Sequence, residues 1–348
     1  MSAAKTDPAY DALAGLDSAP LWRYFGDLFL REPRSAARPH RWEYAALRPL
    51  ALHFADTLSL EEAERRVLML INPGMQDPPA TVNSLFAGLQ IILPGETAQA
   101  HRHTANAFRF IIEGESAYTT VNGERVHMNP GDLLMTPGMH WHDHYHEGDR
   151  PMIWLDGLDF PLTNSFEAGF FELFGDRSQK SLVPDDLSSR QFIHGRLNPA
   201  WLPAAGPASP VGNYPWQETA RAFAAIADDA EGSESEGIVL EYTNPWTGGP
   251  VLPTIDCKIS RLRPRFHGRA RRTTASTIVH VVHGEGYMEI GDERFDFAPK
   301  DVIAVPGWQP HRFVNTSAGE DAVLFACSNR PALQALGLLR EDLPGSDA

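Results

Sequence analysis

The amino-acid sequence predicts an all-β dominated chain: two antiparallel jelly-roll β-barrels in tandem, a helical amino-terminal arm and a helical linker. Short apolar runs separated by Gly, Pro and Asn follow one another without intervening helices, as in antiparallel barrels. The pattern returns further along the chain, and 348 residues are too many for one ordinary hydrophobic core. We therefore expect two barrels of similar size.

The composition excludes several classes of function. A formal net charge of -15 at pH 7 disfavours the electrostatic attraction on which nonspecific nucleic-acid binding depends. No apolar run approaches the roughly 18 residues of a membrane-spanning helix, and the first residues lack the apolar stretch of a secretory signal. The sequence predicts a cytoplasmic protein without nucleic-acid or membrane partners. Cys257 and Cys327 lie in apolar, strand-like runs and are predicted to be buried thiols rather than a disulfide.

Residues 1–58 are predicted to form a helical arm. Apolar residues at helical spacing mark one helix near residues 21–29, and residues 44–58 are a second apolar candidate that Pro49 should interrupt. The arm is expected to pack on a larger core or on a neighbouring subunit. The sequence Ser-Leu-Glu-Glu at residues 59–62 matches a capping box and should open a short helix.

The first barrel is assigned to residues 59–170. Asn122-Gly123, between two strand-like runs, is a strong signal for a two-residue hairpin turn. The expected strands are short apolar runs bounded by turn residues, and they fall at residues 67–71, 85–93, 108–112, 116–121, 133–135 and 152–155.

Residues 171–235 are predicted to be a linker, with Pro, Ser, Gly and acidic residues around one helical segment at residues 217–227. The strand pattern returns in residues 236–330, the second barrel, and residues 331–348 form a carboxy-terminal tail. Matching motifs about 170 residues apart indicate a tandem duplication. The matched pairs are Asn72-Pro73 with Asn244-Pro245, Ile111 to Glu115 with Val281 to Glu285, Asn122 to Glu124 with Gly291 to Glu293, and Pro137 with Pro306.

A metal site is predicted in the first barrel. Alternate side chains of a strand point to the same face, so His101 and His103 should both point into the barrel while Arg102 points away. His142, which follows a hairpin, can complete one face of a coordination polyhedron and leave the opposite positions open. Any one of these histidines alone would be better explained as an ordinary core or surface residue. The three together predict a metal centre.

These segments resemble the paired motifs of the cupin family. The first motif is a Gly, five residues, His-x-His and a later Gly; the second is a Gly, five residues, a Pro, four residues and a His. The matching positions are Gly95, His101, His103 and Gly114, followed by Gly131, Pro137 and His142. Where cupins usually carry a Glu ligand, this chain has Ala107. Sites with that Glu are typical of manganese-dependent oxalate-degrading cupins, whereas three histidines without it resemble the ring-cleaving bicupin dioxygenases, which use non-haem Fe(II).

Further motifs resemble the gentisate 1,2-dioxygenase and salicylate 1,2-dioxygenase family over nearly the whole chain. They are Glu64 to Arg66, Asn72 to Gly74, Gly88 to Glu96, Phe108 to Gly114 and Trp141 to His144. The resemblance implies one Fe(II) per chain, in the first barrel, and a reaction of dioxygen with a small ortho-hydroxy aromatic carboxylate. Gentisate, cleaved to maleylpyruvate, is the favoured substrate. Salicylate, substituted salicylates and 1-hydroxy-2-naphthoate stay open, and a non-catalytic metal-binding bicupin is a more distant alternative. Because the family is commonly homotetrameric, a homo-oligomer is expected.

Three polar side chains are candidates for binding the substrate. Arg109 has the inward parity of His103 and can grip a carboxylate with its two-pronged guanidinium, although a strand arginine could also be exposed. Arg65 is a candidate by resemblance, with a surface helix as the alternative. Gln90 lies on the strand before the ligands and could hydrogen-bond the substrate or sit in the core.

His144 is the candidate acid–base residue. It shares the inward parity of His142 and could take a proton from the substrate hydroxyl. Asp156 could orient it, and ordinary surface roles compete for both. The resemblance adds Phe86 and Gly88 as pocket residues, with Gly88 leaving room for a substrate. His140 and His146 are expected at the rim of the site, and Trp141 in the barrel wall.

The second barrel is predicted to lack a metal. Aligning the repeats places Arg271 and Thr273 at the His-x-His positions, so only His311 remains of the trio. One histidine does not hold iron, so this barrel is expected to be structural or to help assembly. An arginine cluster at residues 261–272 is better explained by ion pairs between domains or subunits than by a phosphate-binding patch.

Overall fold

The computed structural model describes residues 7–63, 65–192, 197–202, 206–226 and 230–342. Glu64 and parts of the predicted linker and tail lie outside these ranges. By their contacts the residues fall into two units, Met1–Arg34 and Ser35–Ala348. The first unit holds two short helices, α1 (Pro8–Ala14) and α2 (Leu21–Leu28), and none of their residues is buried. The apolar side chains of α2 are therefore exposed within their own unit.

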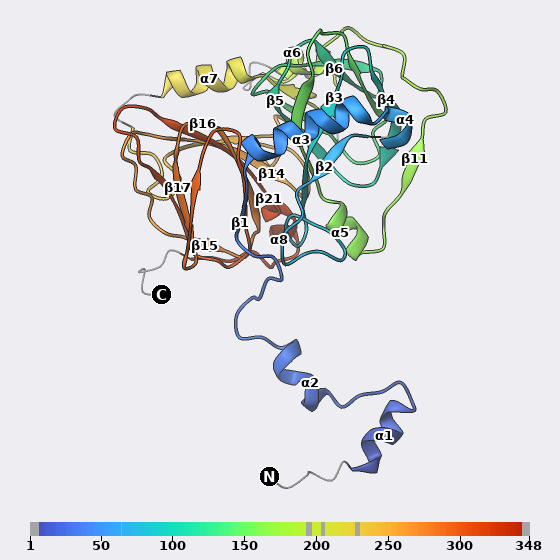
Figure 1. Cartoon of the computed structure of the whole chain (residues 1–348), viewed down its shortest axis with the longest axis vertical. Coiled ribbons are helices and arrows are strands. Elements are labelled where there is room, and N and C mark those ends of the chain that lie inside the picture. Colours follow the sequence, from blue (N-terminus) through green and yellow to red (C-terminus); the bar gives the residue numbers. More distant parts are fainter. Residues whose placement is uncertain (1–6, 64, 193–196, 203–205, 227–229, 343–348) are drawn as a thin grey trace. The chain divides into compact units, whose positions relative to one another are not determined.

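The second unit contains two antiparallel β-barrels, drawn in cyan to green and in orange to red (Figure 1). The strands of the first barrel are β2 (Val67–Met69), β3 (Phe86–Ile92), β4 (Thr97–His103), β5 (Ala107–Glu113), β6 (Ala117–Val121), β7 (Glu124–Met128), β8 (Leu133–Thr136), β9 (His142–His146) and β10 (Met152–Leu158). The strands of the second are β13 (Ile238–Tyr242), β14 (Asp256–Leu262), β15 (Arg272–Thr273), β16 (Thr277–His283), β17 (Gly286–Ile290), β18 (Glu293–Phe297), β19 (Val302–Val305), β20 (His311–Asn315) and β21 (Ala322–Ser328).

Four further short strands extend these sheets. They are β1 (His40–Trp42), β11 (Phe171–Leu173), β12 (Asn213–Tyr214) and β22 (Glu341–Asp342). With them, each barrel has a six-stranded sheet, ordered β12-β8-β5-β10-β3-β2 in the first and β1-β19-β16-β21-β14-β13 in the second. The opposite sheet is β11-β4-β9-β6-β7 in the first barrel and is divided into β15-β22 and β18-β17-β20 in the second. The matching orders confirm the predicted duplication.

The short edge strands correct the sequence prediction in two places. Residues 1–58 were expected to be helical or irregular, yet β1 pairs with β19 of the second barrel. Residues 171–235 were expected to be a linker, yet β11 pairs with β4 and β12 pairs with β8, both in the first barrel. Each of these strands has only two or three residues, too few for a periodic pattern, and each pairs with a distant partner. Local sequence could not reveal them.

The helices mostly follow the prediction. Helix α3 (Tyr44–Thr57) is continuous, so Pro49 lies inside it and does not interrupt it. The predicted capping box opens α4 (Leu60–Ala63): the Ser59 N–H donates to Glu62 Oε2 at 3.1 Å, and the Glu62 N–H donates to Ser59 Oγ at 3.2 Å. The remaining helices are α5 (Phe160–Ser165), α6 (Leu187–Phe192), α7 (Trp216–Ala225) and α8 (Arg330–Ala335).

The main hydrophobic core is formed jointly by the two barrels. On β5 the even-numbered side chains leave the barrel interior, so Phe108 and Phe110 join the shared core. There Phe110 stacks on Phe325 of the second barrel, with ring centroids 4.4 Å apart. Full burial of a phenylalanine stabilises a fold by roughly 2 kcal/mol. The odd-numbered residues of β5, among them Arg109, are left facing the interior of the first barrel.

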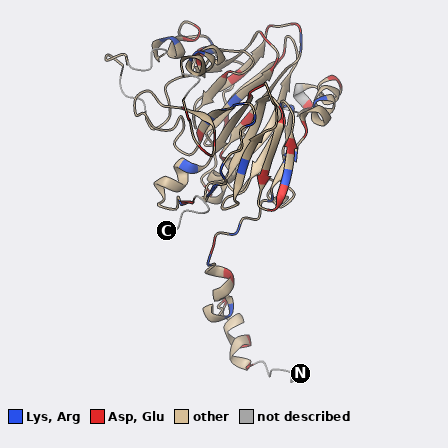
Figure 2. Ribbon diagram, turned by 90° about the vertical axis from the view of Figure 1, so that its left-hand side faces the viewer, with Lys and Arg blue, Asp and Glu red and all other residues tan. Residues whose placement is uncertain are grey.

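Three expectations from the sequence concern membrane spans, charge and the cysteines. Among the described residues no helix is long and apolar enough to cross a membrane. In the view of Figure 2, acidic and basic residues lie intermixed on the strands. Cys257 and Cys327 are both buried and unbridged, as predicted.

Candidate metal centre

The three predicted ligands come together inside the first barrel. His101 and His103 lie on β4, and His142 lies opposite them on β9, where it pairs directly with His101. One ligand atom from each histidine lies within 4.8 Å of the others. Among the described residues this is the group of His, Cys, Asp and Glu side chains that could hold a metal ion. The parity argument from the sequence is confirmed.

Backbone carbonyls fix the orientation of all three rings. The Nδ1 atoms of His101, His103 and His142 lie 3.0, 2.8 and 3.0 Å from carbonyl oxygens two residues away in the chain. At His103 and His142, an N–H on Nδ1 that donates to the carbonyl leaves Nε2 as the lone-pair atom for a metal. Nε2 of His142 is buried and has no hydrogen-bond partner among the described residues. This orphaned atom and the donor set fit a divalent transition metal with open positions.

The surroundings keep the imidazoles neutral. Burial, followed by the nearby Arg65 guanidinium, lowers the pKa of His101 to about 2. Burial also lowers the pKa of His103 to about 4 and holds the pKa of His142 well below its usual value. Since only a neutral imidazole can ligate a metal, all three residues are in the binding form at pH 7.

Arg109 is buried beside the triad, as its parity predicted, and is only 4% exposed. It pairs with Asp156 across β5 and β10, with Arg109 Nε 3.4 Å from Asp156 Oδ1. Its Nη1 donates to Thr136 Oγ1 at 2.5 Å, while its Nε has no hydrogen-bond partner among the described residues. The guanidinium therefore has donor capacity left for a carboxylate.

Asp156 is held by different partners from those expected. It accepts a hydrogen bond from Trp154 Nε1 at 3.0 Å and faces Arg109, so its partners are Trp154 and Arg109 rather than His144. Burial raises the pKa of Asp156 to about 6, against the opposing effect of the Arg109 charge. The predicted role in orienting His144 is corrected, because strand parity gives the face of a residue but not its neighbour.

His144 is instead oriented by Thr119, which the sequence analysis did not single out. Thr119 Oγ1 lies 2.8 Å from His144 Nδ1, and the two residues are direct partners of β6 and β9. Nε2 of His144 is buried and has no partner among the described residues. Burial, followed by the charge of Arg109, holds the pKa of His144 well below its usual value. The ring is thus neutral, with one nitrogen free toward the interior.

Arg65 contacts a ligand of the site, and Gln90 is buried on the neighbouring strand. Arg65 Nη2 donates to the carbonyl oxygen of Gln99 at 3.2 Å and contacts Nδ1 of His101. Gln90 is buried on β3, paired with Trp154 on one side and Val67 on the other. The surface alternative for Arg65 is thereby disfavoured.

The predicted pocket residues are buried, but the space differs from expectation. The ring centroid of Phe86 lies 4.9 Å from that of Phe160. A Cβ atom on Gly88 would lie 2.5 Å from Val67 Cγ1 and 2.9 Å from Phe86 Cζ. The room that Gly88 leaves is therefore filled by those two side chains rather than open to a ligand.

Two histidines were predicted at the rim of the site, and one aromatic residue beside the site was not predicted. His146 is completely buried at the end of β9, with Nε2 against the carbonyl of Arg150, and so is not an exposed rim residue. His140 is partly buried, its Nδ1 3.1 Å from the Gly138 carbonyl. Phe171 of β11 was missed because it lies in the predicted linker, yet its ring stacks 5.4 Å from His101.

The inward-facing positions of the first barrel are polar near the histidines and apolar further along the same strands. Along β5 the inward residue after Arg109 is Ile111, and along β3 the one after Gln90 is Ile92. These isoleucines belong to a buried apolar cluster with Met128. Water is therefore excluded from below the histidines, which strengthens electrostatic interactions within the polar layer.

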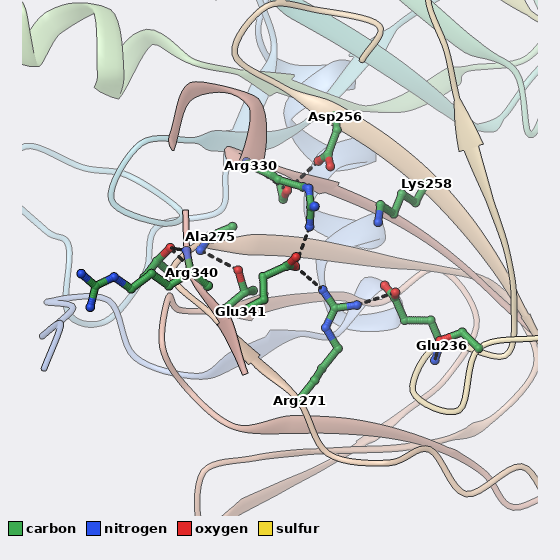
Figure 3. A network of polar contacts seen from close by, with 12 residues as sticks. Glu236, Asp256, Lys258, Arg271, Ala275, Arg330, Arg340 and Glu341 are labelled. Carbon is green, nitrogen blue, oxygen red and sulfur yellow. Dashed lines mark hydrogen bonds and ion pairs between the residues drawn. The ribbon is translucent and has the colours of Figure 1, made fainter. Parts of the chain in front are cut away.

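The second barrel has an ion-pair network where the first has its histidines. Arg271 and His311 form a bridge that matches the His101–His142 pair. Figure 3 shows Arg271 between Glu236 and Glu341, and Glu341 also contacts Arg330. The predicted loss of the metal ligands agrees with this arrangement. The arginine cluster at residues 261–272 contributes ion pairs within this chain, and Arg269 and Arg272 add pairs with Glu234 and Asp342.

The geometry can now be compared with known proteins. The family described as Cupin domain matches residues 88–157 and 261–327, one segment in each barrel. The chain is 39% identical over 332 residues to gentisate 1,2 dioxygenase 1 of Aquipseudomonas alcaligenes, covering 95% of this chain and 94% of that protein. It is also 39% identical over 340 residues to 5-aminosalicylate 1,2-dioxygenase of Comamonas sp, covering 96% and 89%. The chain belongs to the gentisate and salicylate 1,2-dioxygenase family.

Solved structures give the same assignment. The crystal structure of salicylate 1,2-dioxygenase from Pseudoaminobacter salicylatoxidans with gentisate matches with a TM-score of 0.91 and 34% sequence identity. The match covers 99% of this chain and 96% of that chain. This chain is accordingly a ring-cleaving dioxygenase with a bicupin fold, as its motifs predicted.

Proposed function

We propose that this dioxygenase uses one Fe(II), held by His101, His103 and His142, to cleave an ortho-hydroxy aromatic carboxylate, with gentisate as the first candidate. The observation that carries the proposal is the triad of neutral imidazoles beside the buried guanidinium of Arg109. An iron ion held by these three histidines would act as a Lewis acid toward the oxygen donors of the substrate and would activate dioxygen. The ring opens between the two carbons that carry these groups.

Arg109 recognises the substrate carboxylate. Its charge is buried against Asp156, and its Nε makes no hydrogen bond among the described residues, so the guanidinium has donor capacity left for a substrate. A bidentate, charge-assisted contact of this kind fixes the aromatic ring as well as its charge. Arg65 and Gln90 supply further donors at the entrance and on the neighbouring strand.

His144 takes the proton of the substrate hydroxyl. Thr119 Oγ1 also lies 3.4 Å from Met128 Sδ, so its hydroxyl can donate to the sulfur and accept from the Nδ1–H of His144. In that arrangement Nε2 is an unprotonated base that faces the interior. Asp156 acts on this step indirectly, by keeping Arg109 in place.

Gentisate is favoured over other hydroxy acids by the relatives. Proteins named gentisate dioxygenase are matched in several organisms, and the salicylate dioxygenase structure has gentisate bound. The relative from Nocardioides sp, 40% identical over 315 residues, is named for 1-hydroxy-2-naphthoate. Because Phe86 and Val67 fill the space above Gly88, a fused second ring has less room here. The proposed order of preference is gentisate, substituted salicylates, and then hydroxynaphthoate.

A non-catalytic metal-binding bicupin is less consistent with the site. Such a protein would not need Arg109 and Asp156, whose burial costs free energy unless a ligand uses the charge.

The exposed apolar side chains of α2, with Trp22 71% exposed, support the expected homo-oligomer. Light scattering on the purified protein tests the predicted tetramer.

The decisive experiment is anaerobic reconstitution with Fe(II), followed by oxygen uptake and ultraviolet spectra with each aromatic acid. We expect one iron per chain and stoichiometric oxygen consumption, with the highest kcat/KM for gentisate. Oxygen uptake that is absent with every acid, despite bound iron, would exclude the proposed reaction. A higher kcat/KM for salicylate or hydroxynaphthoate would reassign the substrate alone.

A further inference from the structure

The strand that carries two of the three metal ligands has an interrupted pairing along one edge. Strand β4 pairs with β9 at Ala98 and again at His101, but the register is interrupted between these two residues. Within the His-x-His stretch His101 is paired with β9, and the other edge is paired without interruption. There β11 pairs with it continuously, Phe171 with His103, Glu172 with Arg102, and Leu173 with His101.

Side chains outside the barrel hold β11 in this place. Arg102, which points away from the metal site, donates from Nε and Nη2 to Glu172 Oε2 at 2.9 and 2.6 Å. Its guanidinium lies over the ring of Trp141, 4.4 Å from the centroid, and Trp141 meets the ring of Phe174 at 5.0 Å. We call Arg102, Trp141, Glu172 and Phe174 the β4 clasp. In Figure 1, β11 lies at the outer edge of the first barrel beside β4.

The clasp acts on both ligand-bearing strands. Arg102 lies between His101 and His103 in the sequence, and Trp141 directly precedes His142. Their outward side chains are joined to each other and to the segment after the barrel. A shift of this segment would therefore move the backbone of β4 and the start of β9 together.

The duplicated barrel retains the same contact without the metal ligands. Arg272 Nε donates to Asp342 Oδ2 at 2.9 Å, and its guanidinium lies 4.3 Å from the ring centroid of Trp308. Arg272 and Asp342 pair across β15 and β22 as Arg102 and Glu172 pair across β4 and β11. The inward neighbours have changed to Arg271 and Thr273. Because the second barrel has the contact without the metal ligands, a variant there is a control for effects on the fold alone.

We propose that Arg102 and Glu172 are positioning residues that hold the His101–His103 strand in the geometry required for metal binding. The proposal rests on the proposed iron site. The ion pair is partly exposed, with side chains 31% and 42% accessible, and exposed pairs contribute little to global stability. Loss of the pair should instead reduce preorganisation of the ligands, and contacts that orient ligands typically alter metal affinity by about tenfold or more.

The test compares Glu172→Ala with its matched control, Asp342→Ala, in the full-length protein. Anaerobic competition with a chromophoric chelator measures the Kd for Fe(II), and Co(II) alone reports ligand geometry through its visible absorption. We expect Glu172→Ala to raise the Fe(II) Kd about tenfold and to shift the Co(II) bands, with kcat lowered more than KM changes. Asp342→Ala should leave all of these at wild-type values, with a similar change in Tm.

Conservative variants keep the test interpretable if Glu172→Ala folds poorly. Glu172→Gln retains one hydrogen bond to Arg102 and should raise the Fe(II) Kd by less than Glu172→Ala. A wild-type Kd and Co(II) spectrum in both Glu172 variants would overturn the clasp, and so would an equal rise in Asp342→Ala. If wild-type protein bound neither Fe(II) nor Co(II), the proposed iron site itself would fail. If wild type bound both metals and the Glu172 variants bound them equally well, only the clasp would fail.

Discussion

The two barrels share their architecture and differ in what lies inside. Their six-stranded sheets have the same strand order, and each has an arginine paired with a carboxylate outside the first ligand strand. Even the ring orientation of the last histidine persists, since Nδ1 of His142 and of His311 lies 3.0 and 3.1 Å from a carbonyl two residues earlier. Outward and core residues therefore maintain the barrel, while a few inward positions determine whether it can bind a metal.

The charged pair of the first barrel shows this contrast most clearly. Arg109 and Asp156 pair across β5 and β10, and the equivalent residues across β16 and β21 are Val279 and Ala326. Phe313 takes the place of His144. A buried ion pair is often no more stabilising than an apolar pair of similar size. Its presence in one barrel alone supports the proposed role in substrate binding over a role in folding.

The largest effect is expected from the histidine that both barrels keep. His142→Ala should abolish iron retention and turnover, because two imidazoles on one strand hold Fe(II) poorly. His311→Ala should leave iron near one per chain, since Arg271 and Thr273 offer no further ligands. Metal analysis and an oxygen electrode measure both variants. Full activity in His142→Ala, or a loss of iron in His311→Ala, would contradict the assignment of the site to the first barrel.

The second prediction converts the charged pair of one barrel into the apolar pair of the other. Arg109→Ala should raise KM by about 10- to 100-fold through the lost charge-assisted contact. It should also destabilise the fold by about 3 kcal/mol, because Asp156 is left buried without its partner. Urea unfolding and steady-state kinetics measure the two effects.

Copying the second barrel separates stability from function. The double variant Arg109→Val with Asp156→Ala should recover most of the stability lost in Arg109→Ala, because no unpaired charge remains. Its activity should stay lost. A double variant that was as active as the wild type would show that the buried pair does not bind the substrate.

Sequence reasoning succeeded where a local pattern determines geometry. Strand alternation placed the three histidines and Arg109 inside one barrel, and Asn122-Gly123 formed the expected hairpin, with φ of 47° and 85°. These conclusions need only residues that are close in the sequence or repeated at a fixed offset. The duplication itself was visible for the same reason.

Sequence reasoning failed where the contact that determines a residue's role comes from a distant segment of the chain. Parity placed His144 inside the barrel, but the cross-strand register determined that it meets Thr119, while Asp156 meets Arg109 instead of His144. Parity also gives no depth, so His146 was expected at the rim although it is fully buried. The edge strand that carries Phe171 is too short for any periodic signal.

The third prediction concerns the place where the two barrels meet. His280 of β16 is the counterpart of Phe110 of β5, and their rings lie 5.4 Å apart in the shared core. Burial lowers the pKa of His280 to about 3, and its Nδ1 has no partner among the described residues. In the unfolded chain the pKa is about 6.5, so the unfolded state binds more protons between these values. The contribution of His280 to the free energy of unfolding is therefore fully present above pH 6.5 and is lost as the pH falls toward 3.

The size of this effect can be measured in metal-free protein. Relative to neutral pH, the titration of His280 alone should lower the free energy of unfolding by on the order of 2 kcal/mol at pH 5. His280→Leu should flatten the decline between pH 6.5 and pH 5 in urea titrations, whereas His53→Leu, at an exposed position of α3, should not. Parallel curves for wild type and His280→Leu would show that this histidine does not couple the barrel interface to pH.

The smallest effect is expected from the ion-pair network of the second barrel. Glu341→Gln removes the anion shared by Arg271 and Arg330, but Arg271 keeps Glu236, and Glu341 is 39% exposed. Because solvent screens such pairs, the loss in unfolding free energy should be about 1 kcal/mol or less and should vanish in about 1 M salt. Iron content and kcat should not change. A loss of iron from Glu341→Gln would show that the second barrel supports the metal centre of the first, and the separation of roles between the barrels would then fail.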